Sequence, residues 1–231
     1  MKKKIAVLTG AGISAESGLK TFRDSGGLWE GYDVMDVASI EGWHRNREKV
    51  LEFYNLRRKQ AWHALPNAGH RALVDLEEAF DVVIITQNVD NLHEKAGSSM
   101  VVHLHGELSK VKSSVDESYV VDIEDGEITL GDVCPKGGQL RPDVVWFGEM
   151  VPMMEVAARH VEECDILLII GTSLVVYPAA GLAHLTRPGT RIYVVDPSRP
   201  EIFGLSGVEF ITETAATGTP ALVKRLMNKK A

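Results

Sequence analysis

The 231-residue sequence has few cysteines, no long apolar run and no excess of positive charge. Two cysteines, Cys134 and Cys164, are too few for a disulfide framework and fit a reducing compartment. No stretch approaches the ~18 apolar residues that span a membrane. The basic N-terminus precedes only a short apolar run, "IAVL", which is too short for a secretory signal. We therefore predict a cytoplasmic protein without membrane association.

The charge balance also limits the partners. A formal net charge of −7 argues against general nucleic-acid binding, because such binding needs a basic surface. A local basic patch around residues 57–59 stays open as an alternative. The hydrophobic content of 45% is typical of a soluble globular protein, and the length allows one sizeable core with a small second lobe.

Short apolar runs alternate with helical patterns along most of the chain. The runs are nearly continuous in apolar residues, as expected of parallel strands that are covered on both faces. The predicted strands are residues 4–9, 81–86, 100–105, 165–171 and 191–196. The predicted helices between and after them are residues 67–80, 153–164, 179–186 and 220–229. This alternation predicts a Rossmann-like, doubly wound parallel α/β sheet.

Two stretches interrupt the alternation and predict a small inserted lobe. Residues 30–65 have helical periodicity, whereas residues 107–143 are polar and rich in turns. Within the second stretch, "SYVVDIEDGEITLG" predicts a β-hairpin around Asp125-Gly126. We expect a helical module plus a β-hairpin-containing module. The large domain would then comprise residues 1–29, 66–106 and 144–231, and the small domain residues 30–65 and 107–143.

A glycine-rich loop follows the first predicted strand. Gly10 and Gly12 would let backbone N–H groups approach a diphosphate at the start of a helix. The usual dinucleotide fingerprint is only half met, because Ala15 stands at its third glycine position, so a simple tight turn is the alternative. The sequence "FRD" at 22–24 favours a binding site, since it adds a cation and an acceptor.

Polar residues stand where later strands are predicted to end, and the carboxyl ends of strands are where open α/β sheets bind ligands. Gln87, Asn88 and Asp90 offer amides and a carboxylate that suit a carboxamide and a ribose. Helix capping is the alternative role for Asn88 or Asp90, and it can coexist with binding. Further donors and a ribose acceptor are expected from Gly171, Thr172, Ser173 and Asp196.

Two histidines lie in "VHLHGE" at 102–107. A strand histidine is more often a packed residue than a catalyst. His105 differs from His103 because it precedes Gly106 at the predicted strand end, where a neutral imidazole could act as a general base near neutral pH.

Five motifs together resemble the sirtuin family, in that family's order and over essentially the whole chain. They are "GAGISAESGLKTFR", "TQNVDNLHEKAG", "HLHGEL", "RPDVVWFGE" and "GTSLVVYPAAG". The resemblance implies an NAD-dependent protein lysine deacylase with a Rossmann-type large domain and a small zinc-bearing domain. It implies that His105 is the catalytic base, which deprotonates a ribose hydroxyl while the acyl oxygen of the modified lysine attacks and nicotinamide leaves. The products would be nicotinamide, free lysine and O-acyl-ADP-ribose.

The resemblance also implies the binding residues. Asn88 and Asp90 would hold the nicotinamide carboxamide and Gln87 the ribose. The dinucleotide loop would be lined by Gly10, Ala11, Gly12, Glu16, Phe22, Arg23 and Trp29. The adenosine end would be flanked by Gly171, Thr172, Ser173, Asp196 and Ala215. The substrate peptide would add as a strand along Val145, Phe147, Gly148 and Glu149.

The sequence departs from the family pattern at the metal site. The family usually carries two pairs of cysteines in the small domain, but this chain has Ser113 or Ser114 where the first pair would begin and Cys134 alone later. A tetrahedral structural zinc needs four good ligands. We predict that zinc is absent and that strand pairing and packing alone hold the small lobe together.

Tyr54 and Arg57 share a helix face at i and i+3. The alternatives are a solvated stack of Arg57 on Tyr54 and a clamp for a carboxylate. The pair is similar to the Tyr-x-x-Arg of the class III sirtuin branch, which implies an acyl pocket for succinyl- or malonyl-lysine, with small Ala15 leaving room for the longer chain. A charge-assisted bond of roughly 1.5–3 kcal/mol predicts about ten- to hundred-fold discrimination, with acetyl-lysine as a slower substrate.

Two other functions are weighed against deacylation. An NAD-dependent ADP-ribosyltransferase would share nicotinamide release, but Tyr54 and Arg57 favour an acidic acyl-lysine. A non-catalytic NAD-sensing protein is disfavoured by His105, Asn88 and Asp90. The expected partners are acylated lysine-containing proteins or peptides.

Overall fold

A parallel sheet of six strands forms the larger part of the computed structural model, which describes residues 2–20, 28–29, 31–200, 204–205 and 207–228. The strand order is β11-β10-β9-β1-β4-β5, and every pair is parallel. The bounds are β1 (Lys4–Thr9), β4 (Asp81–Thr86), β5 (Val101–His103), β9 (Ile166–Ile170), β10 (Arg191–Val195) and β11 (Val208–Ile211). The predicted parallel sheet is confirmed, although β11 was not among the predicted strands.

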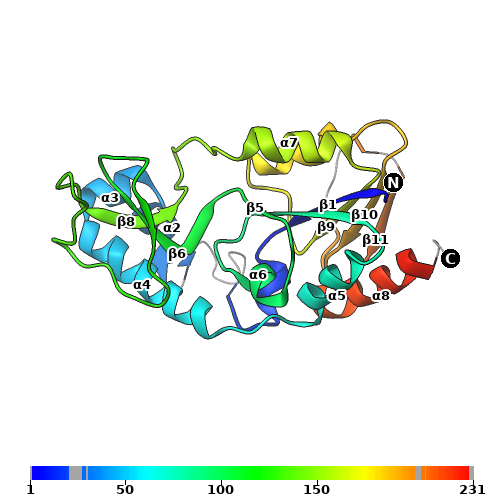
Figure 1. The fold of residues 1–231 in the computed structure, drawn as a ribbon, viewed down its shortest axis with the longest axis horizontal. Coiled ribbons are helices and arrows are strands. Elements are labelled where there is room, and N and C mark those ends of the chain that lie inside the picture. The colour runs from blue at the N-terminus through cyan, green and yellow to red at the C-terminus, as the bar shows by residue number, and fades with distance from the viewer. Residues whose placement is uncertain (1, 21–27, 30, 201–203, 206, 229–231) are drawn as a thin grey trace.

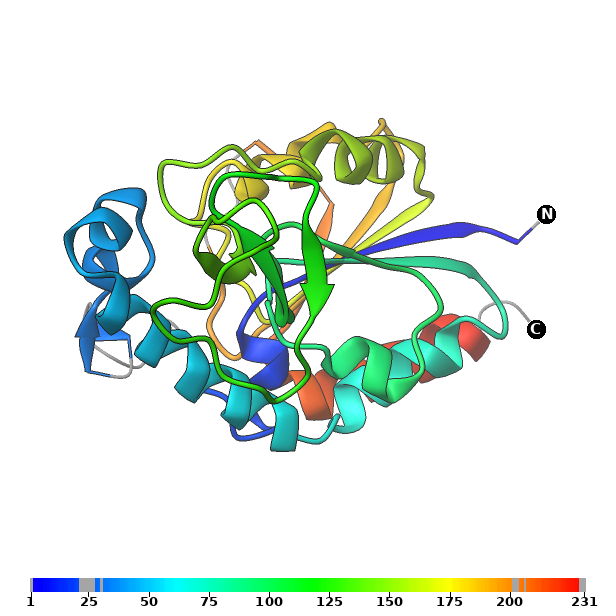
Figure 2. The same cartoon turned by 60° about the vertical axis from the view of Figure 1, so that its left-hand side comes forward.

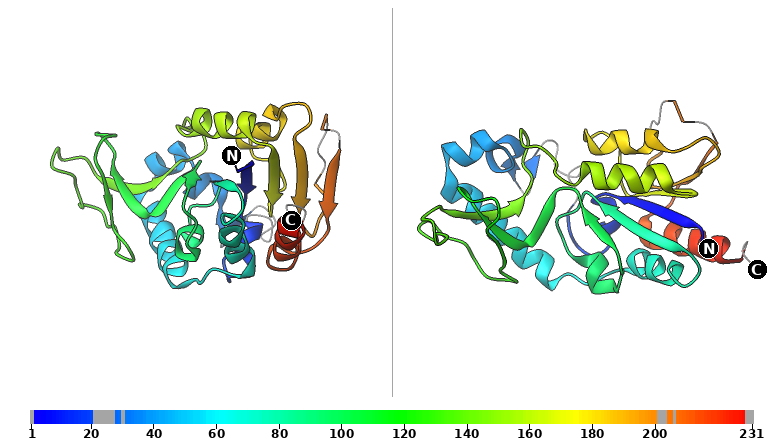
Figure 3. Two further views of the ribbon diagram at one scale, coloured as in Figure 1. Left: turned by 45° about the vertical axis from the view of Figure 1, so that its right-hand side comes forward. Right: turned by 45° about the horizontal axis from the view of Figure 1, so that its top comes forward.

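Helices cover both faces of this sheet, as Figures 1 and 3 show. One face packs against α5 (Ala68–Leu76) and α8 (Ala215–Asn228), and the other against α7 (Met154–Glu163) and the 3₁₀ helix η1 (Ala179–Leu185). Alternate residues of β1 serve the two faces, because successive side chains of a strand point in opposite directions. The doubly wound architecture is thus confirmed, while the helix predicted at 179–186 is a 3₁₀ helix.

A separate antiparallel sheet has the order β7-β6-β8. Its strands are β6 (Gly106–Ser113), β7 (Val120–Asp122) and β8 (Leu140–Val144). It packs against α4 (Arg47–His63), which follows α2 (Val34–Val37) and α3 (Ile40–Arg45), as Figures 1 and 2 show. A short antiparallel pair, β2 (Leu28–Trp29) and β3 (Tyr32–Asp33), precedes these helices. The prediction of helices within residues 30–65 is confirmed.

Side-chain caps explain where the helices of residues 34–63 begin. Asp33, Ser39 and Asn46 each accept a hydrogen bond from a backbone N–H in the first turn of α2, α3 and α4, respectively. Such caps satisfy N–H groups that have no partner within the helix. Each of the three helices that follow one another between residues 34 and 63 therefore begins at a side-chain cap.

The predicted hairpin around Asp125-Gly126 is wrong in its second arm. Its turn forms, since the Gly126 N–H donates to the Ile123 carbonyl at 2.9 Å, but β7 pairs with β6 instead of with residues 127–131. The side chain of Asn55 takes both backbone groups of Ile128: Nδ2 donates to its carbonyl at 2.8 Å and Oδ1 accepts from its N–H at 3.0 Å. Ile128 is thereby held in the core of the small lobe rather than in a strand.

Arg58 joins α4 to the antiparallel sheet. Its side chain is 1% exposed, its Nε donates to the Leu108 carbonyl at 2.7 Å, and its Nη1 donates to Asn55 Oδ1 and the Gly126 carbonyl. Burial lowers the pKa of this guanidinium to about 10, which leaves it charged at neutral pH. Buried polar bonds therefore supplement apolar packing here.

Two further helices, α1 (Gly12–Ala15) and α6 (Leu92–Ala96), follow β1 and β4 and carry part of the site described below. Within the described ranges, no helix combines the length and apolarity needed to cross a membrane.

Candidate functional site

The loops that follow β1 and β9 pack backbone against backbone. The N–H of Gly12 donates to the Gly171 carbonyl at 2.9 Å, and a Cβ on Gly12 would lie 2.7 Å from the Gly171 Cα. Gly171 has φ +61°, and a Cβ there would collide with the backbone nitrogen of Ile13. Only glycine allows this approach. The loop is thus a tight turn, and the same close packing leaves backbone at the carboxyl edge of the sheet for a ligand to contact.

A chain of buried hydrogen bonds crosses from this loop to the end of β4. Asn88 Nδ2 donates to Ser14 Oγ at 3.1 Å, and Ser14 Oγ donates to Asp90 Oδ2 at 3.0 Å. Asp90 Oδ1 also accepts from the N–H of Leu92, the first residue of α6, so the carboxylate contacts the start of that helix as well as Ser14. Burial raises the pKa of Asp90, while these hydrogen bonds offset part of that effect. The carboxamide and carboxylate are therefore held in fixed orientations.

His105 lies just beyond β5 with a defined tautomer. Its Nδ1 donates to the Gln87 carbonyl at 3.0 Å, because a carbonyl can only accept. The neutral ring then carries its lone pair on Nε2, for which the described residues offer no hydrogen-bond partner. Burial lowers the pKa of His105, although the bond to Gln87 acts in the opposite direction. At neutral pH the ring is an uncharged proton acceptor, as a general base requires.

The other predicted residues at the carboxyl edge are engaged with one another. Gln87 Nε2 donates to Thr172 Oγ1 at 3.1 Å, which links the ends of β4 and β9. Asp196 is 4% exposed, and its Oδ1 accepts from both the N–H and the hydroxyl of Ser198. The structure therefore brings these predicted site residues to one edge of the sheet.

Glu16 and Ala215 also meet. Glu16 Oε2 accepts from the N–H of Ala216 at 2.8 Å in the first turn of α8, next to buried Ala215. A carboxylate is stabilised at a helix N-terminus by the unsatisfied N–H groups there. Glu16 thus ties the glycine-rich loop to α8.

Three predicted residues are not located by side chain. Phe22 and Arg23 lie outside the described residues, and of Trp29 only the backbone position in β2 is described. Ala15 ends α1 and is exposed, and Ser173 is partly buried beyond β9.

Tyr54 is a buried residue of the small lobe, only 3% exposed, so a solvated stack of Arg57 on its ring is excluded. Its hydroxyl accepts a hydrogen bond from Trp146 Nε1 at 3.0 Å. Burial raises the pKa of Tyr54 to about 12, although the nearby charge of Arg57 acts to lower it. Arg57 instead lies over the Phe53 ring, at 5.7 Å from its centroid, and its charge also favours ionised Asp90. The pair therefore adjoins the carboxyl-edge site.

The segment after β8 connects His105 to the helical part of the small lobe. The Val145 N–H donates to the His105 carbonyl at 2.9 Å, and the Phe147 N–H donates to the Ala38 carbonyl at 2.8 Å. Phe147 is exposed, and Gly148 has a positive φ of 91°. This segment therefore connects His105, which lies between β5 and β6, to Ala38, the residue that follows α2, through backbone hydrogen bonds.

The Glu149 carboxylate is bonded to other protein groups. It forms a double contact with Arg141, at 2.6 Å and 3.1 Å, and accepts from the Trp146 N–H at 2.8 Å. Burial opposes its charge, yet the hydrogen bonds from Arg141 and from Trp146 lower the pKa of Glu149 overall. The Glu149 side chain therefore holds the segment after β8 in its conformation through bonds to Arg141 and to the Trp146 N–H.

The donor set of the small lobe does not fit structural zinc. Ser113 Oγ donates to Cys134 Sγ at 3.1 Å and accepts from the N–H groups of Val115 and Asp116. Lys136 pairs with Asp116 at 2.7 Å. The described residues hold no group of three or more histidine, cysteine or acidic side chains that could bind a metal. A hydrogen bond and an ion pair thus connect the turn that contains Ser113 and Asp116 to the turn that contains Cys134 and Lys136.

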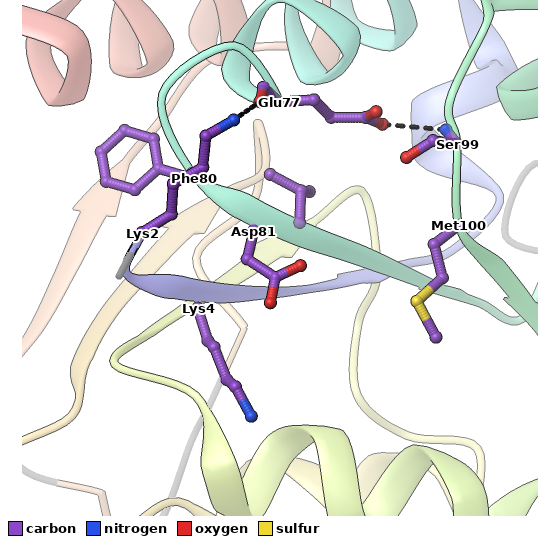
Figure 4. A pocket seen from close by; sticks show the side chains of 8 residues that line it. Lys2, Lys4, Glu77, Phe80, Asp81, Ser99 and Met100 are labelled. Atoms are coloured by element: carbon purple, nitrogen blue, oxygen red, sulfur yellow. Dashed lines mark hydrogen bonds between the residues drawn. The ribbon is translucent and has the colours of Figure 1, made fainter.

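An open pocket of about 520 Å³ lies at the opposite, amino-terminal edge of the sheet (Figure 4). Several of its polar groups are bonded to neighbouring protein groups: Lys2 Nζ to the Glu77 carbonyl, Ser99 N–H to Glu77 Oε1, and Lys4 to Glu163. None of the predicted site residues lines it. The buried polar groups converge instead at the carboxyl edge of the sheet, which is therefore the candidate site.

Sequence reasoning missed Ser14 and Trp146. Ser14 lies in α1, two residues after Gly12, and a hydroxyl there was a signal for a bridge to the polar end of β4. Trp146 lies within "VVWFGE", but its contact with Tyr54 spans 92 residues and has no local signature.

Comparisons with known proteins identify the family of this chain. Residues 10–178 match the Sir2 family. An NAD-dependent protein deacylase of Bacteroides thetaiotaomicron is 50% identical over 97% of this chain and 98% of its own length. One of Helicobacter pylori is 50% identical over 97% and 96%.

Solved structures of Sir2 homologues have the same fold. A Sir2 homologue–NAD complex superposes with a TM-score of 0.89 at 36% identity, covering all of this chain and 91% of the other. A mutant Sir2 homologue in complex with ADP-ribose gives 0.90 at 36% identity, covering 99% and 94%. The chain belongs to the Sir2 family.

Proposed function

We propose that this protein is an NAD-dependent protein lysine deacylase that prefers acidic acyl groups, succinyl or malonyl, and removes acetyl more slowly. Family membership and the names of its relatives support the reaction class. The buried tyrosine and adjacent arginine of α4 support the acyl preference. Its substrates are acylated lysine-containing proteins or peptides.

The observation that carries the proposal is the 3.0 Å contact between His105 Nδ1 and the Gln87 carbonyl, from which the tautomer of His105 follows. Its Nδ1 is occupied by the Gln87 carbonyl, so Nε2 can take a proton from a ribose hydroxyl. When bound, NAD supplies a ribose carbon from which nicotinamide can leave, and an acyl oxygen can attack there. His105 acts as the base, and the hydrogen-bonded residues Asn88, Ser14 and Asp90 orient the carboxamide of nicotinamide.

The remaining NAD-binding roles follow from position at the carboxyl edge. The donor set of amides, hydroxyls and buried carboxylates fits a ligand with a carboxamide, two riboses and a diphosphate. The proposed residues are Gly10, Ala11, Gly12, Glu16, Gln87, Asn88, Asp90, Gly171, Thr172, Ser173, Asp196 and Ala215. Phe22, Arg23 and Trp29 stay predictions from sequence.

For the substrate, Tyr54 and Arg57 form the carboxylate-binding end of the acyl pocket, and Ala15 leaves room for the acyl chain. Guanidinium binds carboxylate through two parallel bonds, and a phenol adds one directed bond. Val145, Phe147, Gly148 and Glu149 form the edge to which the peptide backbone adds.

We also propose that the molecule divides into the two domains predicted from sequence and that the small one folds without zinc. The separate apolar cluster of the antiparallel sheet and α4 supports the division. The Ser113–Cys134 and Asp116–Lys136 contacts support a metal-free connection. The cysteine content alone supports a reducing, cytoplasmic location.

The test compares one peptide bearing acetyl-, succinyl- or malonyl-lysine, with NAD, on wild type and Arg57→Ala. We expect acidic acyl groups to be preferred and Arg57→Ala to reduce that preference by about ten- to hundred-fold. Arg47→Ala is the matched control, because Arg47 is an exposed arginine of the same helix as Arg57, and its guanidinium lies over the aromatic ring of Trp43 in α3. An acetyl preference that is unchanged in Arg57→Ala would contradict the acyl assignment.

Nicotinamide release with and without acyl-peptide separates the reaction classes. A deacylase releases nicotinamide only with acyl-peptide. Release onto an unacylated protein would indicate ADP-ribosyl transfer, and binding of NAD without release would indicate a sensor.

A further inference from the structure

Trp146 has one backbone contact and two side-chain contacts that hold it in place. The backbone N–H donates to Glu149 Oε2 at 2.8 Å, and the Arg141 guanidinium lies 3.3 Å from the centroid of the indole ring. Its Nε1 donates to the hydroxyl of Tyr54 at 3.0 Å. The side chain is 2% exposed. These contacts fix the direction in which the indole N–H points.

That direction determines what Tyr54 can do. An indole N–H can only donate, so the phenol oxygen must act as the acceptor in this bond. The phenol hydrogen then has to point toward a different acceptor, and the described residues supply none. With a pKa of about 12, Tyr54 keeps this hydrogen at neutral pH. Trp146 therefore leaves Tyr54 as a directed donor.

A directed donor beside a cation suits an acceptor-only group. Arg57 stands one helical turn after Tyr54 and is close enough to affect its ionisation. A carboxylate has only acceptor positions, whereas the methyl end of an acetyl group has none. The tyrosine hydroxyl and the arginine thus discriminate by the same charge-assisted bonding.

We propose that Trp146 is a positioning residue for acyl specificity: its indole N–H orients the Tyr54 hydroxyl as a donor toward the terminal carboxylate of an acidic acyl-lysine. The Arg141–Glu149 pair holds the indole in place. This inference rests on the proposed deacylase function and its acidic preference, and it adds a residue that does not itself touch the substrate.

The placement separates this role from catalysis. Residue 145, the neighbour of Trp146, is the one whose N–H is bonded to the His105 carbonyl. That bond uses the backbone only, so replacing the side chain at 146 leaves it intact. A change at Trp146 should alter substrate preference without changing the base.

The experiment is Trp146→Phe, which keeps an aromatic ring and removes the N–H. The kcat/KM for succinyl-peptide should fall by about ten-fold, equal to 1.4 kcal/mol, mainly through KM, while acetyl-peptide changes less than about two-fold. Trp43→Phe is the matched control, because Trp43 is buried in the same apolar cluster, with its ring centroid 5.4 Å from that of Trp146. This variant should leave the ratio of kcat/KM for succinyl-peptide to kcat/KM for acetyl-peptide unchanged.

A double-mutant cycle tests whether the effect passes through Tyr54. In a Tyr54→Phe background, Trp146→Phe should not reduce the preference for succinyl-peptide over acetyl-peptide any further, because the oriented hydroxyl is already absent. Equal losses on both peptides, or additive losses in the cycle, would overturn the inference. If wild type removes no acyl group at all, the proposed function itself fails; if it prefers acidic groups and Trp146→Phe does not alter that preference, only this inference fails.

A measurement on wild type covers the case in which Trp146→Phe does not fold. The four tryptophans give four indole N–H resonances, and Trp29→Phe, Trp43→Phe and Trp62→Phe assign Trp146 by elimination. Succinyl-peptide should shift that resonance and acetyl-peptide should not, since only the former bonds to the Tyr54 hydroxyl. Identical shifts with both peptides would contradict the proposal.

Discussion

His103 and His105 are held by the carbonyls of consecutive residues, yet their ionisation is pushed in opposite directions. His103 Nδ1 lies 3.1 Å from the Asn88 carbonyl, and His105 Nδ1 lies 3.0 Å from that of Gln87. Burial lowers the pKa of each ring. In His103 the carboxylate of Glu94, 2.7 Å from Nε2, outweighs burial and raises the pKa, whereas His105 has no such partner among the described residues. One histidine is thus suited to carry charge and the other to accept a proton.

The first prediction is a pH profile for the proposed deacylation. His105 is active as the neutral base, so kcat/KM should rise as pH increases through its lowered pKa, below 6.5, and be level by neutral pH. His103→Gln should keep the acidic limb in place, and His105→Ala should lower kcat/KM by about 10²–10⁴-fold. An acidic limb that lies above 6.5 in wild type would contradict the assigned environment of His105.

The second prediction concerns the buried guanidinium of Arg58. Arg58→Met keeps much of the apolar stem but leaves the carbonyls of Leu108 and Gly126 without their donor. We expect the free energy of unfolding in urea to fall by about 2–4 kcal/mol. Exposed Lys59, next on the helix, supplies the control Lys59→Met, which should cost less than about 0.5 kcal/mol. Similar losses in both variants would mean that the Arg58 bonds add little.

The third prediction is that purified protein contains no stoichiometric zinc and that a chelator leaves its melting temperature unchanged. The physical reason is the donor set, which lacks four good ligands and already pairs Ser113 with Cys134. Metal analysis with calorimetry checks this. Asp116→Asn, which weakens the pair with the exposed Lys136 ammonium, should lower the free energy of unfolding by less than about 1 kcal/mol. One zinc per chain would contradict the metal-free connection.

The fourth prediction separates backbone strain from loop packing at Gly171. Gly171 and Gly189 both have positive φ, +61° and +91°, so alanine at either pays about 1–2 kcal/mol for a left-handed conformation. Only Gly171 faces backbone atoms that a Cβ would meet; Gly189 has open space. Gly171→Ala should therefore lower the free energy of unfolding, measured in urea, by roughly 1–3 kcal/mol more than Gly189→Ala does. It should also weaken NAD binding, measured by calorimetry. Equal costs would mean that the two loops can separate.

The strands were predictable where burial on both faces leaves a continuous apolar run. β1 and β4 have the predicted bounds, 4–9 and 81–86, because they lie in the middle of the sheet. β11 was missed because it is a short edge strand that contains the charged Glu209. Local pattern is weakest at edges, where one side of the strand faces solvent.

The hairpin around Asp125-Gly126 shows where local reasoning stops. The dipeptide correctly indicated a turn, but the partner of the following residues is the side-chain amide of Asn55 on α4. Likewise, the residues predicted for the site lie at strand ends as expected, while the Ser14 bridge between Asn88 and Asp90 depends on two loops meeting.

The sequence alone determined the parallel sheet, the polar strand ends, the family resemblance and the shortage of zinc ligands, because each of these is written in local composition and spacing. Only the tertiary structure decided that Tyr54 is buried with its hydroxyl accepting from Trp146, that Glu149 binds Arg141, and that Arg58 connects α4 to β6. These contacts join residues from different elements, and hydrogen-bond direction depends on geometry that no single segment contains.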